Sequence, residues 1–235
     1  MAFNRDYGGS IKLVDPDDLG AIQNITRSLT IRDDLYLFTT TAIFRVLTAD
    51  TLDPDRKHPE TKPSYEKIYS IGSQKPMVAR TIVQFNDIFK FLNSPPKQEK
   101  LIDRLWTCTK HLLDCEKASF YIYDQTMKLM PVCDKIIEDN KVFGNIPALP
   151  KISDLDTYVW HFLMSSKHML AETFGFLHDF FGMPFNAQNC AHFDKHIDWI
   201  TKKFGEAHLL SKMLHTDKNW IQIISECSNT NGGEL

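Results

Sequence analysis

The chain lacks three features that would place it in a membrane, secreted or disulfide-rich class. No run of about 18 apolar residues occurs, so no membrane-spanning helix is predicted. The N-terminus has no apolar core of the kind that a secretory signal peptide needs. The five cysteines are odd in number, widely spaced and without a C-x-x-C pair, which favours reduced thiols. We therefore predict a soluble cytoplasmic protein with no membrane partner.

The chain also lacks an excess of charge and the common nucleotide or hydrolase motifs. Its 27 Lys and Arg residues nearly balance 30 Asp and Glu residues, which leaves a net charge of −3. This balance argues against a nucleic-acid partner, because such partners require a basic surface. No G-x-x-x-x-G-K-[ST] loop, G-x-G-x-x-G turn or G-x-S-x-G elbow is present. These motifs therefore assign no nucleotide-binding or serine-hydrolase function.

The residues that are present favour a helical protein. Apolar residues make up 43% of the 235 residues, and sixteen Phe and four Trp suit a thick core or a ligand cavity. Most long segments place apolar residues three and four positions apart, which predicts helices. We predict an all-α, single-domain bundle of about five or six helices. An irregular arm would cover 1–28, a helical domain 29–227 and a mobile tail 228–235. The helices would span 31–49, 76–92, 97–117, 129–140, 154–182 and 187–215, with a long loop over 50–75.

One segment, residues 154–182, organises the predicted bundle. It has no internal proline, it ends at Gly182, and most of its helical surface is apolar. At about 100° per residue, its polar side chains fall within about 40° of one line. This line comprises His161, Ser165, His168, Glu172 and Asp179. No lysine or arginine lies on it, so we predict a helix buried nearly all round, whose imidazoles and carboxylates need partners.

Two residue pairs predict a metal or small-ligand pocket in an antiparallel hairpin formed by residues 154–215. His168 and Glu172 lie one helical turn apart, and His192 and His196 repeat this spacing on the next helix. Imidazole and carboxylate ligands from neighbouring helices suit iron, manganese or zinc. We therefore predict a metal ion, with iron favoured, bound by these four residues, and an oxygen-dependent oxidation as the reaction to test. Further pocket residues would be His161, Asp179 and Glu206.

The two tetrads, H-x-x-x-E at His168 and H-x-x-x-H at His192, resemble part of the ligand set of the hemerythrin family of di-iron oxygen binders. The similarity covers residues 161–196. It ends there, because the closing histidine with an aspartate five residues later is absent, and His208 and His215 project to the opposite side from His192. The family is therefore not assigned.

Cationic residues near the N-terminal side predict an alternative, anion-binding site. Arg56 and His58 lie in the 50–75 loop, which would then act as a lid or clamp over an anionic ligand. Arg80 follows the predicted helix start at Pro76, where backbone amides favour a phosphate or carboxylate. The opposing interpretation is that the loop charges pair among themselves and that Arg80 pairs with Asp87.

A third interpretation concerns RNA. Arg104 and His111 share a helix face, at a spacing similar to the arginine-to-histidine motif of HEPN-type ribonucleases. This resemblance implies an RNA-processing helical protein that uses the two residues on its substrate. The match covers these two residues only, so it assigns no family.

A structural or protein-interaction domain without catalysis is the remaining alternative. The histidines would then be hydrogen-bonded core residues or surface residues rather than ligands. Lys195 and Lys203 lie close in angle to His192 and His196, and their positive charges would repel a metal ion. The sequence is compatible with an oligomer under each of these interpretations.

Overall fold

The computed structural model describes residues 13, 24–89, 94–141, 147–183 and 193–230 of the chain. The chain forms two compact units, Met1–Thr109 and Lys110–Leu235. Most of the predicted arm at 1–28 and residues 231–235 of the predicted tail lie outside the described residues. The arm and the tail therefore stay predictions.

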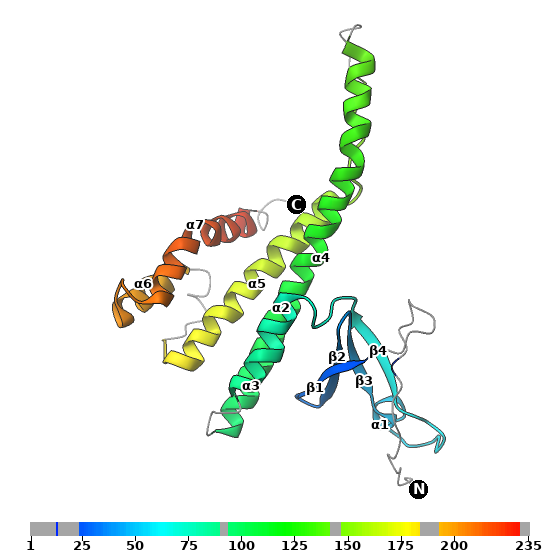
Figure 1. The fold of residues 1–235 in the computed structure, drawn as a ribbon, viewed down its shortest axis with the longest axis vertical. Helices are drawn as coiled ribbons and strands as arrows, with labels where there is room; N and C mark the ends of the chain where they lie inside the picture. The colour runs from blue at the N-terminus through cyan, green and yellow to red at the C-terminus, as the bar shows by residue number, and fades with distance from the viewer. Residues whose placement is uncertain (1–12, 14–23, 90–93, 142–146, 184–192, 231–235) are drawn as a thin grey trace. The chain divides into compact units, whose positions relative to one another are not determined.

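The first unit contains a four-stranded antiparallel sheet, so the all-α prediction is wrong. Its strands are hydrogen-bonded in chain order (Figure 1): β1 (Ile25–Ile31), β2 (Asp34–Thr39), β3 (Ile43–Leu47) and β4 (Ser64–Tyr69). The first three strands occupy most of residues 31–49, for which the sequence predicts a helix. This segment is rich in leucine, isoleucine, threonine and phenylalanine, and β-branched and aromatic residues favour strands. The fold therefore combines helices with a sheet.

Two tight turns explain why the helical pattern misleads. Arg32, between β1 and β2, has a left-handed φ of 55°, which arginine rarely adopts. Between β2 and β3, the Thr39 hydroxyl accepts a hydrogen bond from the Ala42 amide at 2.9 Å. Each turn interrupts the alternation of apolar residues along the strands. The apolar positions of successive short strands then fall at the three- and four-residue spacings of a helix.

Both faces of the sheet are buried. One face carries the apolar cluster Leu13, Leu37, Ala42, Phe44 and Val46. On the other face, Trp106 of α4 (Pro95–Asn140) packs against Tyr36 and Phe38, with ring centroids 4.6 and 6.1 Å apart. The start of α4 thus closes the core of the first unit.

Short helical segments connect the sheet to α4. The predicted 50–75 loop contains most of α1 (Ala49–Leu52) and all of β4. The next helix, α2 (Pro76–Val78), begins at Pro76 as predicted and continues through the π-helical η1 (Ala79–Gln84) into α3 (Phe85–Phe89). Just before α2, a Cβ on Gly72 would lie 2.4 Å from the Thr39 carbonyl oxygen. Glycine is needed there because two backbone segments approach closely.

The second unit consists of the rest of α4 together with α5 (Leu155–Phe181), α6 (Phe193–Phe204) and α7 (Leu209–Thr230). The prediction of a helix over 154–182 is confirmed, and α5 ends at Gly182 with a φ of 68°. The predicted helix over 187–215 is divided at Gly205, whose φ is 88°. None of the described helices combines the length and the apolar character that crossing a membrane requires. The core of α5, α6 and α7 contains Leu170, Phe174, Leu177, Met183, Ile200 and Ile221.

Replacing Leu37 by Ala is expected to lower the free energy of unfolding by about 2–5 kcal/mol, because the change leaves a cavity in a closed core. Leu37 is 5% exposed, whereas Leu52 of α1 is 44% exposed and provides a matched control. Leu52→Ala should change the free energy of unfolding by less than about 1 kcal/mol. Urea denaturation followed by tryptophan fluorescence measures both effects. Equal effects of the two substitutions would contradict the packing of the sheet.

Candidate functional site

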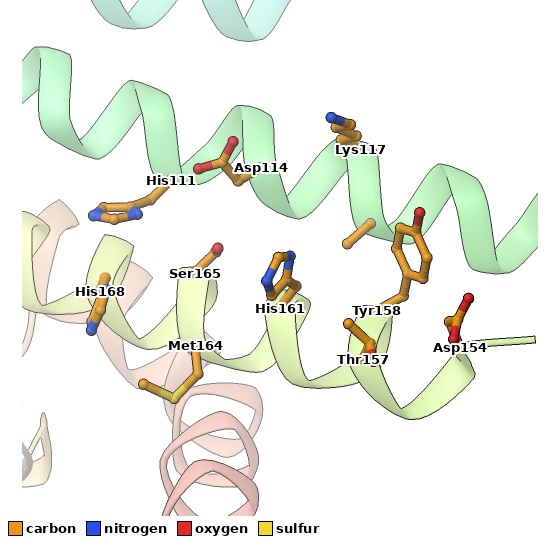
Figure 2. A pocket seen from close by; sticks show the side chains of 11 residues that line it. His111, Asp114, Lys117, Asp154, Thr157, Tyr158, His161, Met164, Ser165 and His168 are labelled. Atoms are coloured by element: carbon orange, nitrogen blue, oxygen red, sulfur yellow. The ribbon is translucent and has the colours of Figure 1, made fainter.

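A groove of about 640 Å³ lies between α4 and α5 in the second unit (Figure 2). The α4 wall contributes His111, Asp114, Lys117 and Ala118. The facing wall contributes Thr157, Tyr158, His161, Met164, Ser165 and His168, with Asp154 at the start of the helix. Figure 2 shows these side chains projecting from two helices that run alongside each other. Polar groups from both helices therefore share one cavity. We call it the histidine groove.

Two contacts hold α4 and α5 together beside the histidine groove. The Cys115 thiol lies 3.3 Å from the Ser166 hydroxyl, and both side chains are buried. Further along α4, the Tyr121 ring stacks on Tyr158 with a centroid distance of 3.7 Å. Burial raises the pKa of the Cys115 thiol, although its hydrogen bond with Ser166 acts in the opposite direction. The thiol is therefore protonated at neutral pH and serves packing rather than nucleophilic chemistry.

Two imidazoles meet at one end of the groove. The rings of His111 and His168 are 5.1 Å apart between centroids and are inclined by 66°. Burial lowers the pKa of His111, and the neighbouring His168 lowers it further, while Asp114 and Glu172 act in the opposite direction. His111 is therefore neutral at pH 7. A neutral imidazole offers one hydrogen-bond donor and one acceptor.

The predicted polar line of α5 forms one wall of the histidine groove. Of its members, His161, Ser165 and His168 line the groove, and the charge of Glu172 reaches His111. His161 and His168 are exposed, whereas Leu170 on the opposite side of α5 is buried. The line therefore faces an open groove, although the sequence predicts a helix buried nearly all round.

Three of the four predicted metal ligands, His168, Glu172 and His196, are among the residues that the structure describes. His168 faces His111 in the groove. His196 is buried at 4% exposure, and its ring stacks on Phe174 with a centroid distance of 4.8 Å. His192 lies outside the described residues. Among the residues that the structure describes, no group of three or more His, Cys, Asp or Glu side chains could hold a metal ion. The iron site therefore stays a prediction.

The two remaining pocket residues of the sequence prediction lie away from the histidine groove. Asp179, near the end of α5, approaches His178 at 4.0 Å. Glu206 is exposed in the turn between α6 and α7. Neither residue is among the described residues that line the histidine groove.

The predicted anion-binding residues mostly have acidic neighbours. The Arg56 guanidinium donates two hydrogen bonds to the Asp50 carboxylate, at 3.1 and 3.0 Å. His58 lies 3.6 Å from Glu60. Arg80 is exposed on η1, and Asp87, its partner in the opposing interpretation, binds Arg27 instead. The loop charges thus pair with one another, as that interpretation proposes for the loop.

Sequence reasoning missed the α4 wall of the groove. It did not single out Asp114 and Lys117, and it placed His111 with Arg104 in an RNA-processing role. Arg104 is not among the described residues that line the groove. The available signal was the spacing of His111, Asp114 and Ala118, which lie three and four residues apart and share one face of a helix. Only the tertiary structure shows that this face meets the polar line of α5.

No protein-family model, curated protein or solved structure matches the chain.

Acidification should destabilise the protein through His111. Because its pKa is lower in the folded state, the stability contributed by the neutral imidazole is complete above the unfolded pKa of about 6.5 and is lost as the pH falls through the folded value. The melting temperature of the wild type should therefore drop as the pH falls below about 6.5, and that of His111→Gln should drop less. Thermal unfolding followed by circular dichroism measures the difference.

A control for this prediction is Ser165→Ala, which alters the same groove without removing a titratable group. Its melting temperature should depend on pH as steeply as that of the wild type. An identical pH dependence in His111→Gln and the wild type would contradict the proposed burial of a neutral imidazole.

Proposed function

We propose that the protein binds a small polar molecule bearing an amine in the histidine groove. The observation that carries this proposal is the convergence of imidazole and carboxylate groups from two facing helices on one open cavity. A volume of about 640 Å³ lies within the range of roughly 300–1,000 Å³ that is typical of small-molecule sites. The groove is therefore large enough for a metabolite.

The charges of the lining favour a cationic group on the ligand. The lining includes two carboxylates, Asp114 and Asp154, and one ammonium, Lys117. These three side chains sum to a negative charge. Glu172 adds a further negative charge close enough to influence His111, and Lys110 adds a positive one. A cavity with an excess of carboxylates attracts a positively charged ligand and disfavours an anion.

Each wall supplies a different part of the recognition. The Asp114 carboxylate accepts hydrogen bonds from an ammonium group, and a neutral His111 adds a further acceptor or donor. Lys117 gives the ligand's own carboxylate a partner, so that a zwitterion such as a free amino acid also fits. The stacked Tyr121 and Tyr158 rings provide a rigid apolar boundary at the far end.

The groove is open to solvent, which favours ligand binding over a reaction that requires the exclusion of water. His161 and His168 are both exposed, so water reaches the imidazoles that would perform acid and base chemistry. An oxygen-dependent oxidation depends on the iron prediction and on His192. We also propose a cytoplasmic location, where an odd number of dispersed cysteines stays reduced.

Titration of the purified chain with diamines and free amino acids, followed by calorimetry, tests this function. The wild type should bind at least one of these probes, and Asp114→Asn should weaken that binding about tenfold or more, since a hydrogen bond to a charged group contributes about 1.5–3 kcal/mol. Glu138→Gln is the matched control. It removes the same charge from the same helix at an exposed position outside the groove.

Two results would contradict the proposal. In the first, phosphate and dicarboxylates bind but amines do not. In the second, Asp114→Asn and Glu138→Gln weaken amine binding equally. Parallel titrations with Fe²⁺ and Zn²⁺ test the metal prediction, because a metal site requires binding that survives Asp114→Asn and is lost in His168→Ala.

A further inference from the structure

A stripe of exposed apolar side chains begins on α4 beside the start of α5 and continues along α4 past it. The Tyr121 hydroxyl donates a hydrogen bond to the Ser153 carbonyl at 3.5 Å, so Tyr121 lies level with the start of α5. The helix continues over residues 122–140, roughly 28 Å at 1.5 Å per residue. Figure 1 shows this part of α4 extending beyond α5. The stripe consists of Phe120, Tyr123, Met127 and Met130, which are 69%, 63%, 49% and 52% exposed.

The spacing of the stripe is that of a helix-pairing seam. Its four residues are separated by three, four and three positions, which is the a and d pattern of a coiled coil. Large side chains at such positions insert between residues of a facing helix. Solvent-exposed apolar side chains scattered singly are common, but a continuous stripe marks a docking surface.

The charges near the stripe suit pairing with an identical surface. Residues 119–133 contain one acidic and one basic side chain, Asp124 and Lys128. These two form an ion pair at 2.6 Å within the helix. The segment is therefore electrically neutral, and two copies approach each other without like-charge repulsion.

An apolar hollow of about 350 Å³ lies next to the stripe in the same unit. It is lined by Ser119, Ile122, Tyr123, Thr126 and Phe162. A projecting side chain and a hollow on one surface are what a two-fold symmetric contact needs, because each copy offers the projection and receives its equivalent. Phe120, the most exposed member of the stripe, is the projection best suited to this hollow.

The apolar area also matches that of a stable dimer. With about 150–250 Å² for a fully exposed side chain of this size, the four residues present roughly 350–600 Å² per copy. A standard interface covers about 800 Å² per partner, of which a little over half, roughly 450 Å², is apolar. The stripe alone therefore supplies the apolar part of such an interface.

We propose that the protein forms a homodimer in which this stripe and hollow of α4 pack against the same surface of a second copy. The contact is separate from the histidine groove. It therefore stands or fails independently of the proposed ligand.

Sedimentation velocity of the full chain between about 1 and 200 µM tests the dimer. The wild type should change from monomer to dimer over this range. Met127→Glu places two carboxylates at the seam and should raise the dissociation constant at least tenfold. Val132→Glu is the matched control, because Val132 is 47% exposed on the opposite side of α4 and should leave the dissociation constant unchanged.

Circular dichroism of each variant checks that the helices are retained, and Phe120→Ser provides a second substitution in the stripe with the same expected loss. A wild type that stays monomeric up to the highest concentration would overturn the proposal. This holds even if a different protein binds the stripe. Dimerisation that withstands both Met127→Glu and Phe120→Ser would overturn it equally.

Discussion

The close approach of α4 and α5 is the constraint on which the candidate site depends. The pairs His111 and His168, Cys115 and Ser166, and Tyr121 and Tyr158 meet in antiparallel order along the two helices. Small side chains at the middle pair let the backbones come together, while longer polar residues beside them leave the histidine groove open. The same register places the start of α5 beside Tyr121, so the continuation of α4 carries exposed apolar residues.

The sequence predicts those parts of the structure that depend on local pattern. The helix over residues 154–182 was predicted from its long periodic pattern. Its end was predicted from Gly182, which takes a left-handed conformation. The sheet was not predicted, because the turns at Arg32 and Thr39 give short strands a helix-like spacing. The polar line of α5 was predicted, but not what faces it. Pairing with His111 and Asp114 is a tertiary property that spacing along one helix does not encode.

The environment of the imidazoles determines which chemistry the groove supports. An enclosed cluster would favour metal coordination, since buried imidazoles and carboxylates need partners. The exposure of His161 and His168 removes this requirement, because water satisfies them. Burial lowers the pKa of His111, which keeps this imidazole neutral and suits it to accept or donate a hydrogen bond. His196 stacks on Phe174, which gives it a packing role in the described part of the second unit.

Nuclear magnetic resonance of the histidine ring nitrogens, recorded during titration with an amine that binds, tests whether the ligand occupies the histidine groove. Binding in the groove should shift the signals of His111 and His168 together, and those of His58 and His215, which do not line the groove, should stay in place. Unchanged His111 and His168 signals at saturating amine would show that the ligand binds elsewhere and would contradict binding in the histidine groove.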